Sequence, residues 1–127
     1  MRALLHFRVR RGSQTPLVSA VEQPHRLLDL KELDSSEGIP MVLLTVIVAE
    51  TTNEDWGFWQ LPLTSLLRRF DSLLNQDAVL QSRLIFDRVK LTEMGPLFFE
   101  HDLLGYLGKR RIALQVVEAE LNPDEWA

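Results

Sequence analysis

The run Met41–Ala49 (MVLLTVIVA) constrains the fold most strongly, because it is rich in β-branched residues and only Thr45 interrupts its apolar character. β-Branched side chains favour extended backbone, and a strand that is apolar on both faces belongs inside a sheet. The run therefore predicts a central strand covered on at least one side by a helix. It is far shorter than the ~20 apolar residues that a membrane-spanning helix requires.

A single amphipathic helix is predicted over residues 62–75. Its apolar residues recur at the i, i+3, i+4 spacing of one helical face, and they are Leu63, Leu66, Leu67, Phe70, Leu73 and Leu74. Pro62 suits the first turn of such a helix, where its missing N–H costs nothing. Asp77 is expected to cap a short turn that runs through Gln81.

Strict alternation predicts a first strand over Ala3–Val9, with His6 and Arg8 on its polar, exposed side. Further strands are expected over Arg83–Leu91 and Lys109–Leu121, the last with a bulge at Val116 and Val117, where its apolar parity shifts. Residues 13–38 and 96–108 fit neither period clearly. Of these, residues 13–24 suggest a loop because they are polar and contain two prolines.

These elements predict an α+β fold: a mostly antiparallel sheet of four to five strands, with one main amphipathic helix packed on one face. One domain is expected over residues 1–121, followed by a flexible C-terminal tail over 122–127. An alternative arrangement joins strand 41–49, helix 62–75 and strand 83–91 as a right-handed parallel crossover. Both arrangements bury the same face of the helix.

Composition narrows the possible functions. The 127 residues include no Cys, which removes disulfides, thiol nucleophiles and iron–sulfur clusters. The net charge of −4 argues against whole-surface attraction to nucleic acid or anionic lipid, so neither is an expected partner. The first residues lack the apolar core of a signal peptide. We therefore expect a cytoplasmic protein.

Candidate catalytic residues are few. The local cluster Glu100-His101-Asp102 has poor chelating geometry, because consecutive side chains diverge, and it is more simply a solvated loop. Asp87 shares the parity of apolar residues, which indicates a paired carboxylate, a residue at an exposed strand end or a catalytic carboxylate. No nucleophile elbow or Gly-rich phosphate loop occurs. We expect no metal, no cofactor and no enzymatic activity; the alternative is a small enzyme or ligand-binding domain whose pocket lies between helix 62–75 and residues 96–108, near Asp87 and His101.

Two kinds of surface residue suggest protein contacts. Trp56, Phe58 and Trp59 fall within four residues at the junction between a loop and the predicted helix, and Trp126 lies in the acidic tail. Exposed aromatic side chains are typical of interface hot spots, although a lid over the helix would also explain the first three. Basic clusters at 8–11 and 109–111 would merge if their strands were antiparallel neighbours; otherwise they are solvated strand ends.

From about Ile39 to Leu121 the chain contains the succession MVLLTVIVAE, LPLTSLLRRFDSLL, NQDAVLQ, RLIFDRVKL, FFEHDLLGYLGK and RRIALQVVEAE. In this succession it resembles the tail-terminator and tail-completion proteins of long-tailed phages. The resemblance implies a small α/β subunit without enzymatic activity that forms a hexameric ring and is assembled into a virion-like particle. Such proteins commonly open with an amphipathic helix, and the predicted strand Ala3–Val9 departs from that pattern.

The sequence thus favours a non-enzymatic assembly or adaptor subunit that is homo-oligomeric and acts through protein surfaces. Nucleic-acid binding through the basic strand ends is a further hypothesis. The candidate contact residues are Trp56, Phe58, Trp59, Arg8, Arg10, Arg110 and Trp126.

Overall fold

The computed structural model describes residues 1–12, 26–33, 40–50, 56–71, 79–90 and 98–120. The elements in these ranges are strands β1 (Arg2–Arg10), β2 (Arg26–Leu33), β3 (Met41–Glu50), β4 (Val79–Asp87) and β5 (Ile112–Val116), helices α2 (Trp56–Leu67) and α5 (His101–Lys109), and the 3-10 helix η2 (Arg68–Phe70). Within the described ranges, no helix has the length and apolar character needed to cross a membrane.

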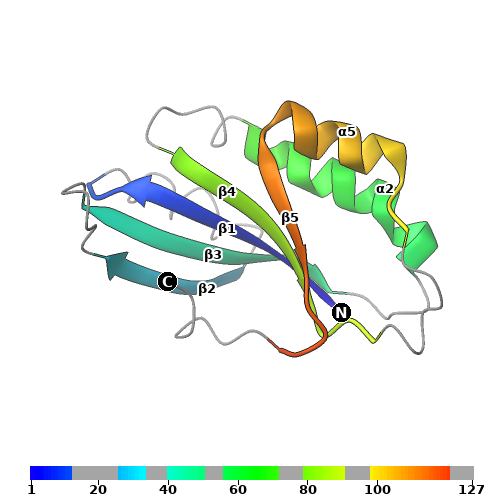
Figure 1. The fold of residues 1–127 in the computed structure, drawn as a ribbon, viewed down its shortest axis with the longest axis horizontal. Helices are drawn as coiled ribbons and strands as arrows, with labels where there is room; N and C mark the ends of the chain where they lie inside the picture. Colours follow the sequence, from blue (N-terminus) through cyan, green and yellow to red (C-terminus); the bar gives the residue numbers. More distant parts are fainter. Residues whose placement is uncertain (13–25, 34–39, 51–55, 72–78, 91–97, 121–127) are drawn as a thin grey trace.

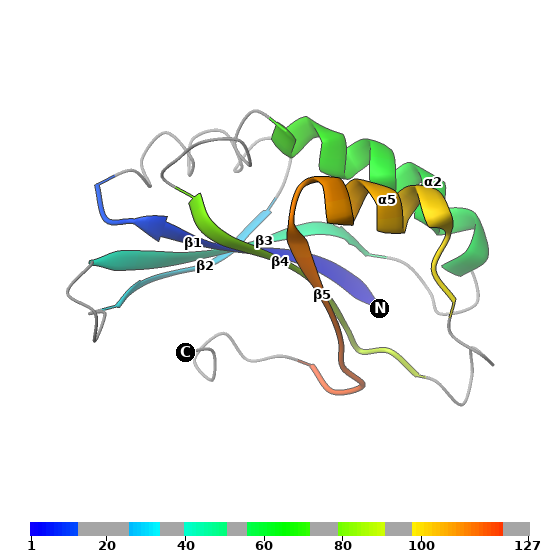
Figure 2. The same ribbon diagram turned by 45° about the horizontal axis from the view of Figure 1, so that its top comes forward.

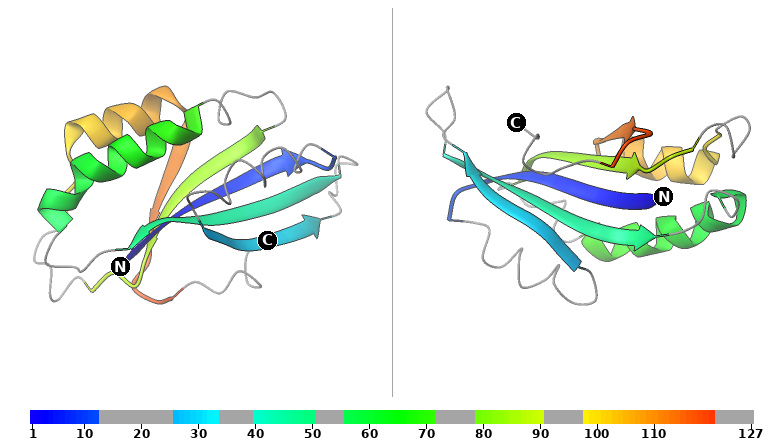
Figure 3. Two further views of the ribbon diagram at one scale, coloured as in Figure 1. Left: turned by 180° about the vertical axis from the view of Figure 1, so that it is seen from behind. Right: turned by 90° about the horizontal axis from the view of Figure 1, so that it is seen from below.

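The five strands form one sheet in the order β2-β3-β1-β4-β5 (Figure 1). All neighbouring strands are antiparallel except β4 and β5, which are parallel. Helices α2 and α5 lie side by side on one face of the sheet, away from β2 (Figures 2 and 3). The predicted α+β class and the mostly antiparallel sheet are therefore confirmed in outline. The predicted single main helix is matched only loosely, because α5 is a second helix on the same face.

The main core lies between the helices and the sheet. Alternate residues of β1, including Leu5 and Phe7, meet Leu63, Leu67 and Phe70 from α2 and η2. The Phe7 and Phe70 rings lie 6.3 Å apart between centroids. Helix α5 completes this core with Leu103, Tyr106 and Leu107.

Strand β3 is central, as its sequence predicts, and both of its faces are buried. Val42, Leu44, Val46 and Val48 belong to the main core, while Leu43 and Thr45 are buried on the opposite face. Burial on both faces explains why the run is apolar almost throughout.

The predicted parallel crossover is only half correct. Strands β3 and β4 run parallel to each other because both are antiparallel to β1, but β1 lies between them in the sheet. The adjacent parallel crossover is instead β4–α5–β5.

Helix α2 begins at Trp56 rather than at Pro62, which lies inside the helix. The aromatic residues 56–59 thus form its first turn instead of a loop, although their side chains lie outside the described part of the molecule. Proline disfavours a helix interior because it removes a backbone donor, and glycine disfavours it through entropy. Pro62 and Gly57 therefore explain why the sequence predicts a later start for this helix.

Three other predicted boundaries are wrong. Strand β4 runs over Val79–Asp87 rather than 83–91, so residues 79–81 are extended and do not form the expected turn. Lys109 ends helix α5, and the last strand covers only Ile112–Val116. Instead of a bulge within that strand, Val117 follows its end, and its backbone N–H donates to the Phe86 carbonyl at 2.8 Å.

Candidate functional site

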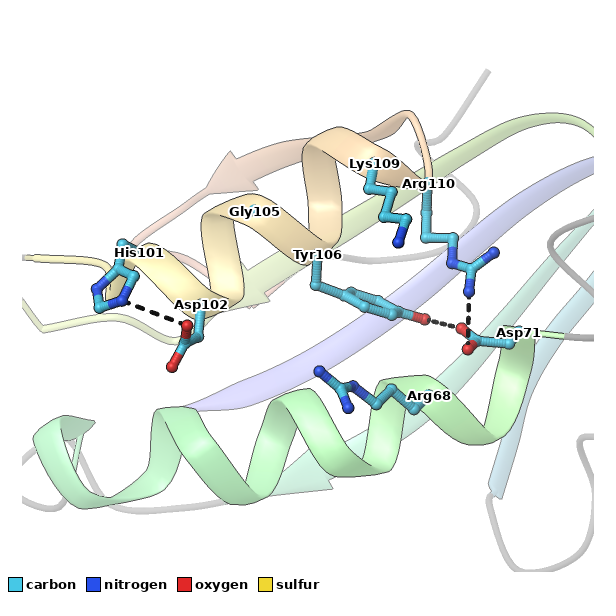
Figure 4. Close-up of a pocket in the computed structure, with 8 residues that line it drawn as sticks. All are labelled: Arg68, Asp71, His101, Asp102, Gly105, Tyr106, Lys109 and Arg110. Carbon is cyan, nitrogen blue, oxygen red and sulfur yellow. Dashed lines mark hydrogen bonds and ion pairs between the residues drawn. The ribbon is translucent and has the colours of Figure 1, made fainter.

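A groove of about 440 Å³ lies between η2 and α5 (Figure 4). Its lining residues come from the end of the first helical segment and from one face of the second: Arg68, Asp71, His101, Asp102, Gly105, Tyr106, Lys109 and Arg110. This location agrees with the predicted pocket between helix 62–75 and residues 96–108. His101 lines the groove, as that hypothesis requires, but Asp87 does not.

One wall of the groove is a closed hydrogen-bonded cluster around Asp71. The Tyr106 hydroxyl donates to Asp71 Oδ1 at 2.6 Å and contacts the Leu67 carbonyl oxygen at 2.9 Å. Arg110 Nη2 donates to Asp71 Oδ2 at 2.9 Å, and its guanidinium lies 6.0 Å from the Tyr106 ring centroid. Burial and the bond to Asp71 raise the pKa of Tyr106 well above its usual value. The tyrosine therefore stays protonated and anchors α5 to η2.

Arg68 and Lys109 face the same groove from opposite helices and are exposed (Figure 4). Within the described ranges, neither side chain makes an ion pair. Among the described residues, no carboxylate neutralises them, whereas Arg110 is bound to Asp71.

His101 begins α5 and lies at the far end of the groove from Arg110 (Figure 4). Its side chain is 90% exposed, and its Nε2 atom is 3.3 Å from Asp102 Oδ1. The prediction of a solvated loop at residues 100–102 is wrong about the backbone, which is helical from His101 onward. It is right about the side chains, which are exposed. Among the described residues, no three His, Asp or Glu side chains gather as metal ligands would.

Asp87 lies in the sheet and is paired. It is completely buried beside Arg2, its cross-strand neighbour on β1. Arg2 Nε donates to Asp87 Oδ1 at 3.0 Å and Arg2 Nη2 donates to Oδ2. This two-point hydrogen bonding raises the pKa of the Arg2 guanidinium. Of the three interpretations that the sequence allows for Asp87, the structure supports the paired carboxylate; Asp87 does end strand β4, but it is buried rather than exposed.

His6 is buried, contrary to the prediction that it is exposed. It does lie on the side of β1 opposite the main core, as alternation predicts, but that second face is also covered near its centre. Its Nδ1 atom hydrogen-bonds Thr45 Oγ1 at 2.8 Å. Burial, with the nearby charges of Arg83 and Arg8, lowers the pKa of His6 to about 4.

The two basic clusters do not lie on neighbouring strands, because β4 separates β1 from β5. They do lie at the same end of the sheet, since Phe7 and Ile112 are both paired with Ser82 of β4. Arg10 is exposed there, and Arg110 is only partly exposed because it binds Asp71. Of the aromatic candidates, Trp126 and the side chains of Trp56, Phe58 and Trp59 lie outside the described part of the molecule.

Sequence reasoning missed Arg68, Asp71 and Tyr106 as site residues. The spacing of Leu103, Tyr106 and Leu107 at i, i+3 and i+4 is a helical signal that could have revealed α5. No comparable signal links Asp71 to Arg110, because that contact depends on how two helices pack.

Comparison with known proteins gives no family. No family model matches the chain, and neither does any curated protein. Among solved structures it is similar to a formyltetrahydrofolate deformylase from Pseudomonas putida, with 13% sequence identity and a TM-score of 0.31. The match covers 98% of this chain and 52% of that one, so the chain spans about half the length of the enzyme. A likeness at this level supports no inference about fold, activity or substrate.

Proposed function

We propose that this chain is a non-enzymatic assembly subunit that forms homo-oligomers by head-to-tail contact, as the resemblance to ring-forming tail-terminator proteins suggests. The observation that carries the proposal is the separation of charge between the two ends of the sheet. This separation depends on the topology, because the strand order and the helix packing bring residues that are distant in sequence to the same end of the sheet.

The cationic end is where β1 finishes and where β4 and β5 begin. Each helix leads into the strand that follows it, so η2 and the last turn of α5 also lie at this end (Figure 1). Lysine and arginine are favourable beside the negative C-terminal ends of helices. The cationic end comprises Arg8, Arg10, Arg11, Arg68, Arg69, Lys109, Arg110 and Arg111. Two carboxylates reduce its positive charge, because Glu32 lies 3.9 Å from Arg11 and Asp71 binds Arg110.

The acidic end is where β3, β4 and β5 finish and where α5 begins. Glu50 is the last residue of β3, and Glu118 and Glu120 follow β5. Glu100 and Asp102 lie at the start of α5. Two cations reduce the negative charge at this end, because Arg88 binds Glu120 at 2.8 Å and Arg2 binds the buried Asp87. The bond to Arg88 lowers the pKa of Glu120, so this carboxyl stays ionised.

Opposite charges at opposite ends favour a heterologous interface, in which the cationic end of one copy meets the acidic end of the next. Such contacts close into a ring when the rotation between copies permits. Charge complementarity supplies the orientation and speeds association. Each end also carries an exposed apolar side chain, Leu80 at the cationic end and Phe98 beside the acidic end, which are 40% and 48% exposed.

The test is the solution mass of the full chain by light scattering as salt is varied. The Debye length falls from about 30 Å at 0.01 M salt to about 3 Å at 1 M. The proposal predicts oligomers at low salt and a shift toward monomer at high salt. A strict monomer at both would refute it.

Two charge reversals locate the interface. Arg69→Glu and Lys90→Glu change the net charge equally, but Arg69 lies at the cationic end and Lys90 follows β4 at the acidic end. Head-to-tail contact predicts that Arg69→Glu weakens association while Lys90→Glu does not. Equal effects would mean that only net charge matters.

The alternative, a small enzyme or ligand-binding domain, now depends on the groove beside His101. Asp87 does not support it, because that carboxylate is buried against Arg2.

A further inference from the structure

We propose that the groove between η2 and α5 binds a small organic phosphate, with the phosphate held by Arg68 and Lys109. Because Arg68 and Lys109 also belong to the cationic end, a ligand here would compete with head-to-tail contact, so binding is measured at a protein concentration and salt at which the chain is monomeric. The argument rests on the charge, the size and the shape of the groove.

The charge of the groove is positive at one end. Asp71 already accepts hydrogen bonds from Tyr106 and Arg110, so it neutralises Arg110 and presents little free negative charge. Arg68 and Lys109 are the other two cations of the lining, Arg68 on the η2 side of the Tyr106 ring and Lys109 on the α5 side (Figure 4). A phosphate monoester carries about −1.5 to −2 charges at neutral pH, which two such cations match.

The helix dipole opposes this binding but is too small to prevent it. Lys109 stands in the last turn of α5, where the helix contributes about −0.5 of an elementary charge. Part of that charge is satisfied locally, because the backbone N–H groups of Arg110 and Arg111 donate to the carbonyls of Tyr106 and Gly108. Two full cations outweigh the remainder.

The size of the groove indicates a ligand larger than inorganic phosphate. Its volume of about 440 Å³ lies in the range of pockets that bind small organic molecules, about 300–1,000 Å³. From Arg68 and Lys109 the groove continues along α5, past Gly105, to His101 and Asp102 (Figure 4). These two polar side chains are placed to contact hydroxyl groups on the organic part.

Gly105 provides a way to block the groove without changing its charge. A Cβ atom built at Gly105 meets no heavy atom within 4 Å, so the helix tolerates a side chain there. Gly108 is equally open and lies in the same helix, but it does not line the groove. Gly105→Leu should therefore fill the groove, and Gly108→Leu is its matched control.

The experiment is calorimetric titration of the full chain at constant ionic strength with three probes: glycerol 3-phosphate, inorganic phosphate and glycerol. The proposal predicts saturable binding of glycerol 3-phosphate with a Kd of about 1 mM or tighter, weaker binding of inorganic phosphate and none of glycerol. Absence of binding by glycerol 3-phosphate overturns the proposal. Equal affinity for glycerol 3-phosphate and inorganic phosphate would refute the claim that the groove also contacts the organic part of the ligand.

Substitutions inside and outside the groove test where the phosphate binds. Arg68→Gln and Lys109→Gln should each raise the Kd for glycerol 3-phosphate by about fivefold or more, because each removes a charged hydrogen-bond donor. Gly105→Leu should raise the Kd by about the same factor, because its side chain fills the groove. Arg69→Gln and Gly108→Leu should leave the Kd within about twofold of the parent value, because a side chain outside the site makes no contact with the ligand. Equal losses in Arg68→Gln and Arg69→Gln would indicate diffuse attraction and refute the site, as would an unchanged Kd in Gly105→Leu.

Discussion

Replacing Asp87 by Asn tests the pairing that the structure assigns to this carboxylate. Asp87 is completely buried and Arg2 is 6% exposed, so the substitution leaves the arginine charge buried without its counter-charge. Breaking a buried pair in this way costs about 3–5 kcal/mol. Glu120, whose Oε1 atom is 3.8 Å from Arg2 Nη2, supplies part of the lost negative charge. We therefore expect the lower end, about 3 kcal/mol.

This loss is measurable by urea unfolding followed by circular dichroism, or as a thermal shift. With an unfolding entropy of about 2.1 cal/mol/K per residue, a loss of 3 kcal/mol lowers the Tm by about 11 °C. Asp102→Asn is the control, because Asp102 is 66% exposed and its contact is with the exposed His101. This variant should change the free energy of unfolding by less than about 0.5 kcal/mol.

A double variant separates loss of the pair from loss of either side chain. Arg2→Met with Asp87→Leu removes both charges, so it should cost at least about 2 kcal/mol less than the sum of the two single changes. A cost below about 1 kcal/mol for Asp87→Asn, or additive single changes, would refute the reasoning.

Three further predictions concern other parts of the fold. Because the folded-state pKa of His6 is about 4, against about 6.5 for an unperturbed histidine, the unfolded chain binds more protons between these pH values. Stability should therefore fall by up to about 3 kcal/mol as the pH drops through this window, and His6→Gln should remove this component when urea midpoints are compared across pH. Gln60 is buried and joins α2 to the start of α5, since it donates to the Phe98 carbonyl at 3.1 Å and accepts from the Glu100 N–H at 2.6 Å. Gln60→Leu should lower the free energy of unfolding by about 2–3 kcal/mol in the same assay, and a neutral result would contradict this role. Arg111 follows α5 with a φ of 56°, a conformation that favours glycine. Arg111→Gly should raise stability by about 0.5–1 kcal/mol, and a loss would show that contacts of the arginine outweigh its backbone strain.

The predictable parts of the fold are those with local periodicity. Alternation of apolar and polar residues located β1 and the apolar run located β3, because each pattern lies within one continuous stretch of sequence. Helix α5 was missed because Gly105 and Gly108 obscure the helical spacing of its apolar face. His6 was assigned to the correct side of β1 but to the wrong environment, because a single strand does not indicate whether its second side is covered.

The candidate site was less predictable than the fold. Its position beside helix 62–75 and His101 could be proposed from the order of the elements. The contacts of Tyr106 and Arg110 with Asp71 could not, because they join residues that are 35 and 39 positions apart and depend on how the helices pack. The shared end of the two basic clusters likewise requires the strand order.

Head-to-tail assembly is tested most directly by mixing two oppositely altered forms of the chain. One carries Arg10→Glu and Arg69→Glu at the cationic end, and the other carries Glu100→Lys and Glu118→Lys at the acidic end. Sedimentation velocity at low salt should find each form monomeric alone and the equimolar mixture oligomeric, because every interface then again joins opposite charges. A mixture that stays monomeric while the unaltered chain associates would contradict the pairing of these two ends.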